Sequence, residues 1–204
     1  LAFYECYGID GMRALDATVD YIRSKYPEIF LIADAKRGDI GNTAKMYAKA
    51  FFEEMDFDAV TIAPYMGADS VTPFLEYKDK WAIVLALTSN ASAYQFQNAQ
   101  KDGKPLYQAV MEEMMEISTP DNMMFVVGAT KADKLQELRS FCPDNFFLVP
   151  GVGAQGGSAE EVIANGSNDH GGLLINSSRG ILFADSTENY AKVAGEVAAK
   201  SANL

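Results

Sequence analysis

The sequence contains few of the residues that bind transition metals. Its 204 residues include two cysteines, Cys6 and Cys142, and one histidine, His170. The cysteines lack metal-ligand spacing, and a single histidine leaves no multi-histidine metal site and at most one catalytic triad. So few cysteines are typical of a protein from a reducing cytoplasm, which is the location we expect.

Positive charge is also scarce. Lysine and arginine total 17 against 28 aspartates and glutamates, so the formal net charge is −11. Nucleic acids and anionic bilayers are bound mainly by lysine and arginine side chains that neutralise phosphates. The charge balance therefore argues against nucleic acid or a membrane surface as a partner.

Long apolar runs are missing as well. No window reaches the roughly 18 uninterrupted apolar residues of a membrane span, whereas Ile29–Ala33 and Ala82–Leu87 are short runs typical of strands. Hydrophobic residues still make up 49% of the chain and aromatic residues 11%, which is enough apolar surface for a sizeable core. We expect one domain over residues 1–204, with no membrane span.

Short apolar segments alternate with longer segments of helical periodicity, and no repeat or Pro/Ser-rich linker interrupts them. Six segments predict buried parallel strands: Ile29–Ala35, Asp58–Ala63, Trp81–Leu87, Met123–Gly128, Asn145–Val149 and Gly172–Asn176. Seven segments predict helices: Gly11–Lys25, Asn42–Met55, Val71–Tyr77, Pro105–Ile117, Ala132–Phe141, Ser158–Asn165 and Thr187–Ala202. The alternation predicts an α/β fold with right-handed crossovers and a parallel sheet.

The number of strands favours a closed barrel over an open sheet. A (β/α)8 TIM barrel has eight strand–helix units in about 250 residues, and six strands are predicted here. The only strand-like segment before the helix at Gly11–Lys25 is Leu1–Tyr4, and we interpret it as the end of the second strand. Because the chain also begins with leucine rather than methionine, we expect a barrel whose first strand and most of whose second are absent from this chain. An open doubly wound sheet is the alternative.

Charged residues cluster at the end of the strand predicted at Ile29–Ala35, in the segment Asp34-Ala-Lys36-Arg-Gly-Asp39-Ile40. Residues two apart on a strand point the same way, so Asp34 and Lys36 project together, and Asp39 follows on the loop. Such groups are costly to bury unless they pair, and their combined field is typical of active sites. The alternative is an ion pair that only closes the strand end.

Two later loops carry groups suited to phosphate. The glycines of Val149–Gly157 let backbone N–H groups approach an anion, and Gln155 adds an amide donor, although a flexible turn is the alternative. The segment Asn176-Ser-Ser-Arg179-Gly180 follows the last predicted strand and supplies a guanidinium. If two strands precede the chain, these loops follow strands seven and eight, which is a recurrent phosphate site in barrels. The pattern predicts a phosphorylated small molecule as ligand.

Four motifs occur in a fixed order along the chain: Asp34-x-Lys36-x-x-Asp39-Ile40-x-x-Thr43, Leu87-Thr88-Ser89-Asn90, Pro150-Gly-Val-Gly-Ala-Gln155-Gly-Gly and Asn176-Ser-Ser-Arg179-Gly180. Together they resemble the orotidine 5′-phosphate decarboxylase family over essentially the whole chain. The resemblance implies a (β/α)8 barrel, a homodimer, no metal or cofactor, and conversion of orotidine 5′-phosphate to UMP and CO2 in pyrimidine nucleotide synthesis.

The resemblance also implies catalytic roles. Asp34 would lie against the substrate carboxylate, and Lys36 would stabilise the carbanion at C6 and supply its proton. Asp39, Ile40 and Thr43 match the part of the motif that the family places in the neighbouring subunit's site, where Asp39 completes the charged array.

Substrate-binding roles are implied in the same way. Gln155 and Arg179 match the phosphate ligands, and Gly153 and Gly180 belong to the same two loops. Either Thr88 or Ser89 would face the pyrimidine ring, and the sequence leaves open which. A helix-capping or turn role is the alternative for both.

The sequence also departs from the family pattern. The family has a lysine just before the segment that matches Leu1–Tyr4 and a ribose-binding aspartate on the first strand, and neither is present here. We interpret the gap as truncation. Two other functions stay open: an Mg²⁺-dependent sugar-phosphate decarboxylase or aldolase that shares the Asp-x-Lys-x-x-Asp strand end, and a catalytically silent phosphometabolite-binding homologue.

Overall fold

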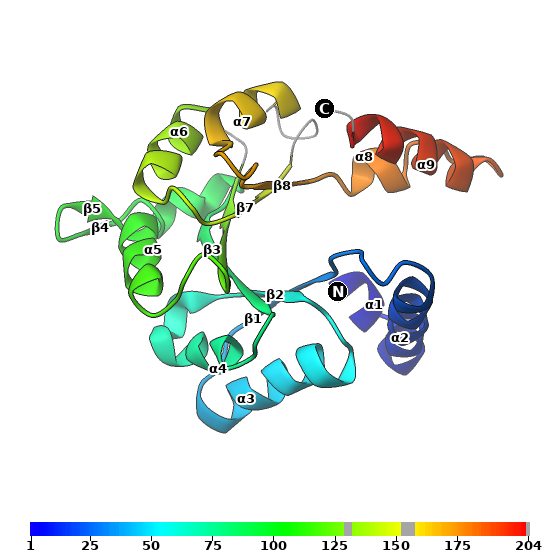
Figure 1. The fold of residues 1–204 in the computed structure, drawn as a ribbon, viewed down its shortest axis with the longest axis horizontal. Coiled ribbons are helices and arrows are strands. Elements are labelled where there is room, and N and C mark those ends of the chain that lie inside the picture. Colours follow the sequence, from blue (N-terminus) through cyan, green and yellow to red (C-terminus); the bar gives the residue numbers. More distant parts are fainter. Residues whose placement is uncertain (129–131, 152–157, 203–204) are drawn as a thin grey trace. The chain divides into compact units, whose positions relative to one another are not determined.

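The computed structural model describes residues 1–128, 132–151 and 158–202 (Figure 1). They form two compact units. The first comprises Leu1–Leu85 and Ala109–Met124, and the second comprises Ala86–Gln108 and Phe125–Leu204. Three elements contribute residues to both units: β3 (Trp81–Leu87), α5 (Leu106–Glu116) and β6 (Met123–Val127).

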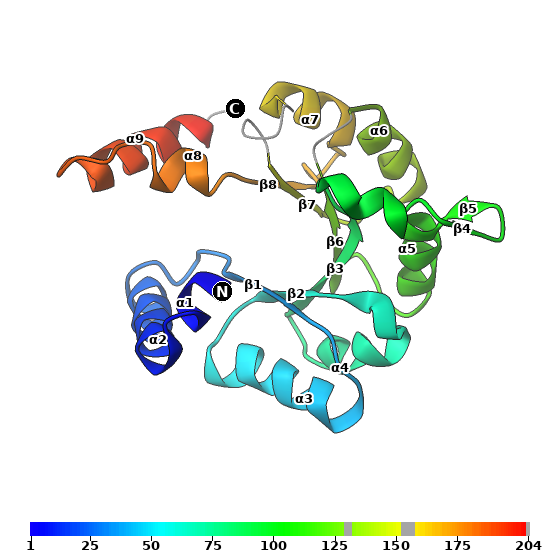
Figure 2. The ribbon, with the colours of Figure 1, turned by 180° about the vertical axis from the view of Figure 1, so that it is seen from behind.

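Most helices of the first unit come from the N-terminal half of the chain. In order, its further elements are α1 (Ala2–Glu5), α2 (Gly8–Lys25), β1 (Ile32–Arg37), α3 (Gly41–Lys49), a π-helical turn (Ala50–Glu54), β2 (Ala59–Ile62), two 3₁₀ turns (Pro64–Met66 and Ala68–Ser70) and α4 (Thr72–Leu75). Both ribbon views place α3 and α4 on the same side of β1 and β2 (Figure 1, Figure 2).

The strands of the first unit pair in parallel in the order β1-β2-β3. Ile32 is in register with Ala59, which is in turn in register with Trp81. The N–H of Ala82 donates to the carbonyl of Asn122 at 3.0 Å, where β6 begins beside β3. Parallel neighbours need crossover connections, and α3 and α4 supply them here.

The second unit repeats the strand–helix alternation. After the end of β3 come a 3₁₀ helix (Ala91–Gln95) and a small hairpin of β4 (Gln100–Lys101) and β5 (Lys104–Pro105). There follow α6 (Ala132–Phe141), β7 (Phe147–Pro150), α7 (Ala159–Gly166), β8 (Leu173–Asn176), α8 (Arg179–Leu182) and α9 (Tyr190–Ser201). Strands β6, β7 and β8 are parallel neighbours in that order.

The core of each unit is built from buried strands that are mostly apolar. All four residues of β2 and all five residues of β6 are buried, as expected for parallel strands covered on both faces. In the first unit Phe51 and Phe74 add fully buried rings, and in the second unit Leu135 and Leu138 add the buried face of α6. These strands give the loops at their carboxyl ends a rigid support.

A single arginine, Arg139, holds together the segments that lead into the amino-terminal ends of β7 and β8. The guanidinium of Arg139 donates to five backbone carbonyl oxygens, those of Gly166, Cys142, Pro143, Asn145 and Gly172, at 2.7–3.1 Å. It also lies over the ring of Phe147, 3.9 Å from the centroid. One side chain thus satisfies loop carbonyls that would otherwise lose their water on burial.

The predicted α/β alternation is confirmed, and all six predicted strands are present. The strand at Trp81–Leu87 has the predicted ends, and the other five have shifted ends. The strand expected at Ile29–Ala35 runs instead over Ile32–Arg37. Its start is delayed because the N–H of Leu31 donates to the Asp58 carboxylate at 2.7 Å rather than to a neighbouring strand. The predicted helix over Asn42–Met55 continues from α3 into the π-helical turn.

The prediction that Leu1–Tyr4 ends a strand is wrong, because Ala2–Glu5 form the short helix α1. The N–H groups of Glu5 and Cys6 donate to the carbonyls of Leu1 and Ala2 at 3.2 and 3.0 Å, so the backbone closes on itself. A strand needs a partner for these groups, whereas a helix satisfies them locally. No helix among the described residues is both long and apolar enough to cross a bilayer.

Candidate active site

Asp34 and Lys36 lie together on one face of β1, as predicted. The alternation of the strand turns Ala33 and Ala35 into the core, with 2% and 9% of their surface exposed, and turns the two charged residues the other way. The Lys36 ammonium donates to Asp34 Oδ1 and forms an ion pair with it. Both side chains are about half exposed, which leaves the pair open to a ligand.

The backbone around Lys36 departs from a regular strand. Pairing with β2 runs from Ile32 to Ala33 and resumes only at Arg37, so the ladder is interrupted by a bulge. Lys36 itself has a φ of +48°, in the left-handed region that disfavours residues with a Cβ. Strain of this kind, on the order of 1–3 kcal/mol, persists only where the surroundings hold it in place, and it is typical of functional sites.

Thr61 on β2 joins the two charged residues. Its hydroxyl accepts a hydrogen bond from the Lys36 N–H at 2.9 Å and donates one to Asp34 Oδ1 at 3.0 Å. Thr61 is completely buried, and sequence reasoning missed it. The available signal was a lone hydroxyl residue in the otherwise apolar strand Ala59–Ile62, directly after the charged strand along the chain.

The surroundings of Asp34 favour its ionised form. Burial by itself raises the pKa of Asp34, but the hydrogen bond and charge of Lys36, followed by the hydrogen bond from Thr61, outweigh it, so the net pKa lies below the ordinary value. The carboxylate is therefore charged throughout the neutral range, and it holds the Lys36 ammonium beside it.

Arg37, within the same motif, serves to brace the strand end. Its guanidinium donates to the Ala35 carbonyl at 2.8 Å, forms an ion pair with Glu5, and lies 5.6 Å from the ring centroids of both Tyr47 and Phe51. The hydrogen bond to Ala35 spans Lys36, so Arg37 fastens the backbone on both sides of the strained residue.

Asp39, Ile40 and Thr43 follow on the turn into α3. Asp39 Oδ1 accepts a hydrogen bond from the Ile40 N–H at 2.8 Å, and within the described part of the chain Asp39 forms no ion pair. Ile40 is 51% exposed, and Thr43 is exposed on the first turn of α3. The structure therefore does not bring Asp39 into the Asp34–Lys36 pair of its own chain.

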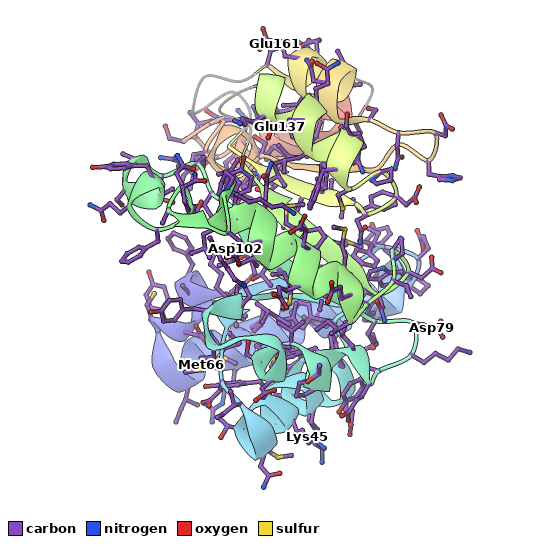
Figure 3. The ribbon with its side chains drawn as sticks, turned by 90° about the vertical axis from the view of Figure 1, so that its left-hand side faces the viewer. Lys45, Met66, Asp79, Asp102, Glu137 and Glu161 are labelled. Atoms are coloured by element: carbon purple, nitrogen blue, oxygen red, sulfur yellow. The ribbon has the colours of Figure 1, made fainter. Side chains whose placement is uncertain are left out.

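Thr88 and Ser89, in the second unit, line a hollow of about 250 Å³ together with Asn90, Tyr107 and Lys134. Glu137, labelled on α6 in Figure 3, accepts hydrogen bonds from the Lys134 ammonium at 2.5 Å and from the Gln108 amide at 2.7 Å. The hydroxyl of Tyr107 is buried without a hydrogen-bond partner among the described residues. The hollow thus combines hydroxyl, amide and ammonium groups.

A glutamine that sequence reasoning missed holds Thr88 in place. The side chain of Gln97 accepts from the Thr88 N–H and donates to the Thr88 hydroxyl, both at 2.8 Å. The Thr88 hydroxyl in turn donates to Asn90 at 2.6 Å, so its one proton is already used. Among the described residues the Ser89 side chain makes no hydrogen bond, which leaves its hydroxyl available to a ligand.

Gly128 allows β6 to approach Ser89 closely. A Cβ at this position would lie 2.8 Å from the backbone nitrogen of Ser89 and 2.9 Å from its Cβ, closer than such atoms pack. The Gly128 N–H also donates to the Leu87 carbonyl at 2.7 Å. Any larger residue at 128 would displace the Thr88–Ser89 turn.

The phosphate residues predicted from sequence are only partly described. Arg179 and Gly180 begin α8 directly after β8, and both are exposed. Gly153 and Gln155 lie outside the described residues. Asp34 and Lys36 belong to the first unit, whereas Thr88, Ser89 and Arg179 belong to the second. Among the described residues, no group of three or more His, Cys, Asp or Glu side chains is placed to hold a metal ion.

Parallel strands that end in charged and hydroxyl side chains define an α/β protein of the (β/α)8-barrel class with its candidate site at the carboxyl ends of the strands. The model of the orotidine 5′-phosphate decarboxylase / HUMPS family matches residues 1–194, and the chain belongs to this family.

Individual relatives agree with the family match. The chain is 55% identical over 195 residues to an orotidine 5′-phosphate decarboxylase of Christiangramia forsetii, covering 96% of this chain and 72% of the relative. It is 55% identical over 201 residues to the protein of the same name from Phocaeicola vulgatus, covering 98% and 74%. The solved structure of Leishmania donovani OMP decarboxylase matches with a TM-score of 0.83 at 36% identity, over 96% of this chain and 75% of that one.

Proposed function

We propose that this chain is an orotidine 5′-phosphate decarboxylase, a carboxy-lyase that converts orotidine 5′-phosphate to UMP and CO2 for pyrimidine nucleotide synthesis. The observation that carries the proposal is the Asp34–Lys36 ion pair at the carboxyl end of β1, in a chain 55% identical to relatives of that name. The names of the relatives indicate the substrate, and the ion pair provides charged groups suited to its decarboxylation.

The ion pair fits the electronic demand of this reaction. Loss of CO2 leaves an electron pair on C6 of the pyrimidine ring, and this charge exists only as the C–C bond breaks. An ammonium fixed beside C6 stabilises that charge more strongly in the transition state than in the ground state, which is the condition for acceleration. Lys36 then delivers a proton to C6, while Asp34 lies against the departing carboxylate and holds the ammonium in place.

The remaining site residues bind the rest of the substrate. We assign the pyrimidine contact to Ser89 rather than Thr88, because the hydroxyl proton of Thr88 is donated to Asn90. Arg179, Gly180, Gly153 and Gln155 hold the phosphate. Phosphate binding contributes binding energy at a distance from the reacting carbon, and this energy can support loop closure.

We propose a homodimer in which each chain completes the site of the other. Ile40 and Thr43 are exposed, Asp39 is partly exposed, and none of them belongs to the Asp34–Lys36 pair of its own chain, so they are available for this role. Residues 1–204 would act as one catalytic domain, since the family model spans both units. The net charge of −11 supports a protein that binds neither nucleic acid nor membranes, and the low cysteine content supports a reducing cytoplasm as its location.

The test is an ultraviolet assay of orotidine 5′-phosphate decarboxylation by the full-length protein, with EDTA in one arm and added Mg²⁺ in the other. We expect equal turnover in both arms. Turnover of a sugar phosphate that needs Mg²⁺, with none of orotidine 5′-phosphate, would replace the proposal with the metal-dependent alternative. UMP binding without turnover in either arm would identify a silent homologue.

A further inference from the structure

We propose that Thr61 is a positioning residue for the decarboxylation, holding Asp34 and Lys36 in their reactive arrangement from the neighbouring strand. The inference rests on the proposed function for its chemistry and on the geometry of β1 and β2 for its mechanism.

The bulge in β1 removes the usual partner of the Lys36 N–H. Between Ala33 and Arg37 the strand advances four residues while its partner β2 advances from Val60 to Ile62. The Lys36 N–H therefore meets no ladder carbonyl, and the Thr61 hydroxyl, at 2.9 Å, is the acceptor that replaces it. An unpaired backbone N–H here would be costly, so this side chain is part of what permits the left-handed backbone of Lys36.

The proton of the Thr61 hydroxyl points to Asp34. A threonine hydroxyl has one proton to donate, and at Thr61 it goes to Asp34 Oδ1 at 3.0 Å. Oδ1 also receives the Lys36 ammonium, so both donors meet one oxygen. In the described part of the chain Oδ2 makes no hydrogen bond. Thr61 thereby orients the carboxylate with Oδ2 free to face a ligand.

Thr61 is held rigidly by its surroundings. Thr61, Val60 and Ile62 each have 0% of their surface exposed, so no water competes for the hydroxyl and the strand has no room to shift. A β-branched side chain also has few χ1 rotamers. Thr61 couples the backbone of Lys36 to the carboxylate of Asp34 through one fixed atom, which is the property a preorganised site requires.

The experiment compares Thr61→Val, which keeps the shape and removes the hydroxyl, with Thr61→Ser, which keeps the hydroxyl. Ser70→Ala is the matched control, since Ser70 is equally buried and its hydroxyl donates, among the described residues, only to the Gly67 carbonyl. Turnover, KM, the pH profile of kcat/KM and the urea midpoint are measured for all four proteins.

For Thr61→Val we expect kcat to fall about tenfold to a hundredfold, the scale of one lost hydrogen bond to a charged group, with KM changed much less. The acid limb of the kcat/KM profile should move to higher pH, because the Asp34 carboxylate loses a donor. Thr61→Ser should recover most of kcat and the original acid limb, and Ser70→Ala should change neither.

Two outcomes overturn the inference. The first is Thr61→Val with wild-type kcat and acid limb. The second is an equal loss in the Val and Ser variants with the acid limb unmoved, which would mean that only packing matters. If the wild type does not turn over orotidine 5′-phosphate, the proposed function fails, and the positioning role is judged by NMR titration of the Asp34 carboxyl carbon. A higher pKa in Thr61→Val than in wild type then supports it, and equal values refute it.

Discussion

The ammonium of Lys36 meets the carboxylate of Asp34 across two residues of a single strand, with the backbone of Lys36 in a left-handed conformation. A regular strand would also place both side chains on one face, but the bulge changes how far Lys36 advances before the chain turns into α3. The arrangement of the pair therefore depends both on the alternation of β1 and on the hydrogen bond that the Thr61 hydroxyl of β2 accepts from the Lys36 N–H.

Replacing Lys36 by alanine should abolish turnover while leaving UMP affinity comparatively intact, because the ammonium acts on charge that develops only during decarboxylation. Lys45→Ala is the matched control. Lys45, labelled on α3 in Figure 3, has the same 52% side-chain exposure, and its one ion pair among the described residues is a long contact of 3.9 Å with Glu76. Decarboxylation rates and UMP titration by calorimetry check this. Near-normal turnover in Lys36→Ala would remove it from the mechanism.

We expect the Lys36→Ala and Asp39→Ala variants to be inactive on their own. Mixing the two chains should restore some decarboxylase activity. If Asp39 acts in the neighbouring subunit's site, a mixed dimer carries one site with both residues intact. Co-expression with two different tags isolates mixed dimers for assay, and the two unmixed variants serve as controls. Failure to recover activity in purified mixed dimers would contradict the shared site.

Gln97→Leu should weaken UMP binding by about tenfold, the effect expected when two neutral hydrogen bonds to Thr88 are lost and the turn loosens. Gln95→Leu is the control, because Gln95 lies two residues earlier and is exposed without a described hydrogen bond. Isothermal titration with UMP measures both. An unchanged dissociation constant in Gln97→Leu would mean that the turn holds its shape without this clamp.

Arg139→Lys should lower the free energy of unfolding by about 2–4 kcal/mol, because an ammonium cannot reach all five carbonyls and leaves buried acceptors unpaired. Arg13→Lys should change it by less than about 0.5 kcal/mol, since Arg13 is exposed and, within the described part of the chain, bonded only to Asp10. Urea unfolding followed by circular dichroism provides the values. Equal midpoints for the two variants would show that the carbonyl cluster tolerates lysine.

The two cysteines should differ strongly in reactivity. Burial raises the pKa of Cys142 to about 11, and its thiol donates to the Asn145 amide oxygen at 3.1 Å, whereas Cys6 is exposed. At pH 8 only about a thousandth of the Cys142 thiol is then ionised, and the thiolate is the reactive form. A thiol-specific dye should label Cys6 in the native protein and Cys142 only after unfolding. Rapid labelling of both in the native state would contradict the buried position.

Much of the fold could be predicted from the sequence because its signals are local. Buried parallel strands appear as short apolar runs. One of the six predicted strands, Trp81–Leu87, matches the observed one, and the other five differ only at their ends. The placement of Asp34 and Lys36 on one face follows from the two-residue period of a strand, so that prediction is confirmed as well. The strand end predicted at Leu1–Tyr4 failed because four apolar and aromatic residues satisfy a helix equally well.

The sequence by itself determined the strand–helix order, the charged motif and the family, since each depends on residue type and spacing along the chain. Only the tertiary structure decided that Thr61 supports the Asp34–Lys36 pair and that Gln97 clamps Thr88. These partners lie 25 to 27 and 9 residues apart in sequence. Their hydrogen bonds depend on strand register and on a loop that folds back, and a one-residue shift in register would turn Thr61 to the other face of β2.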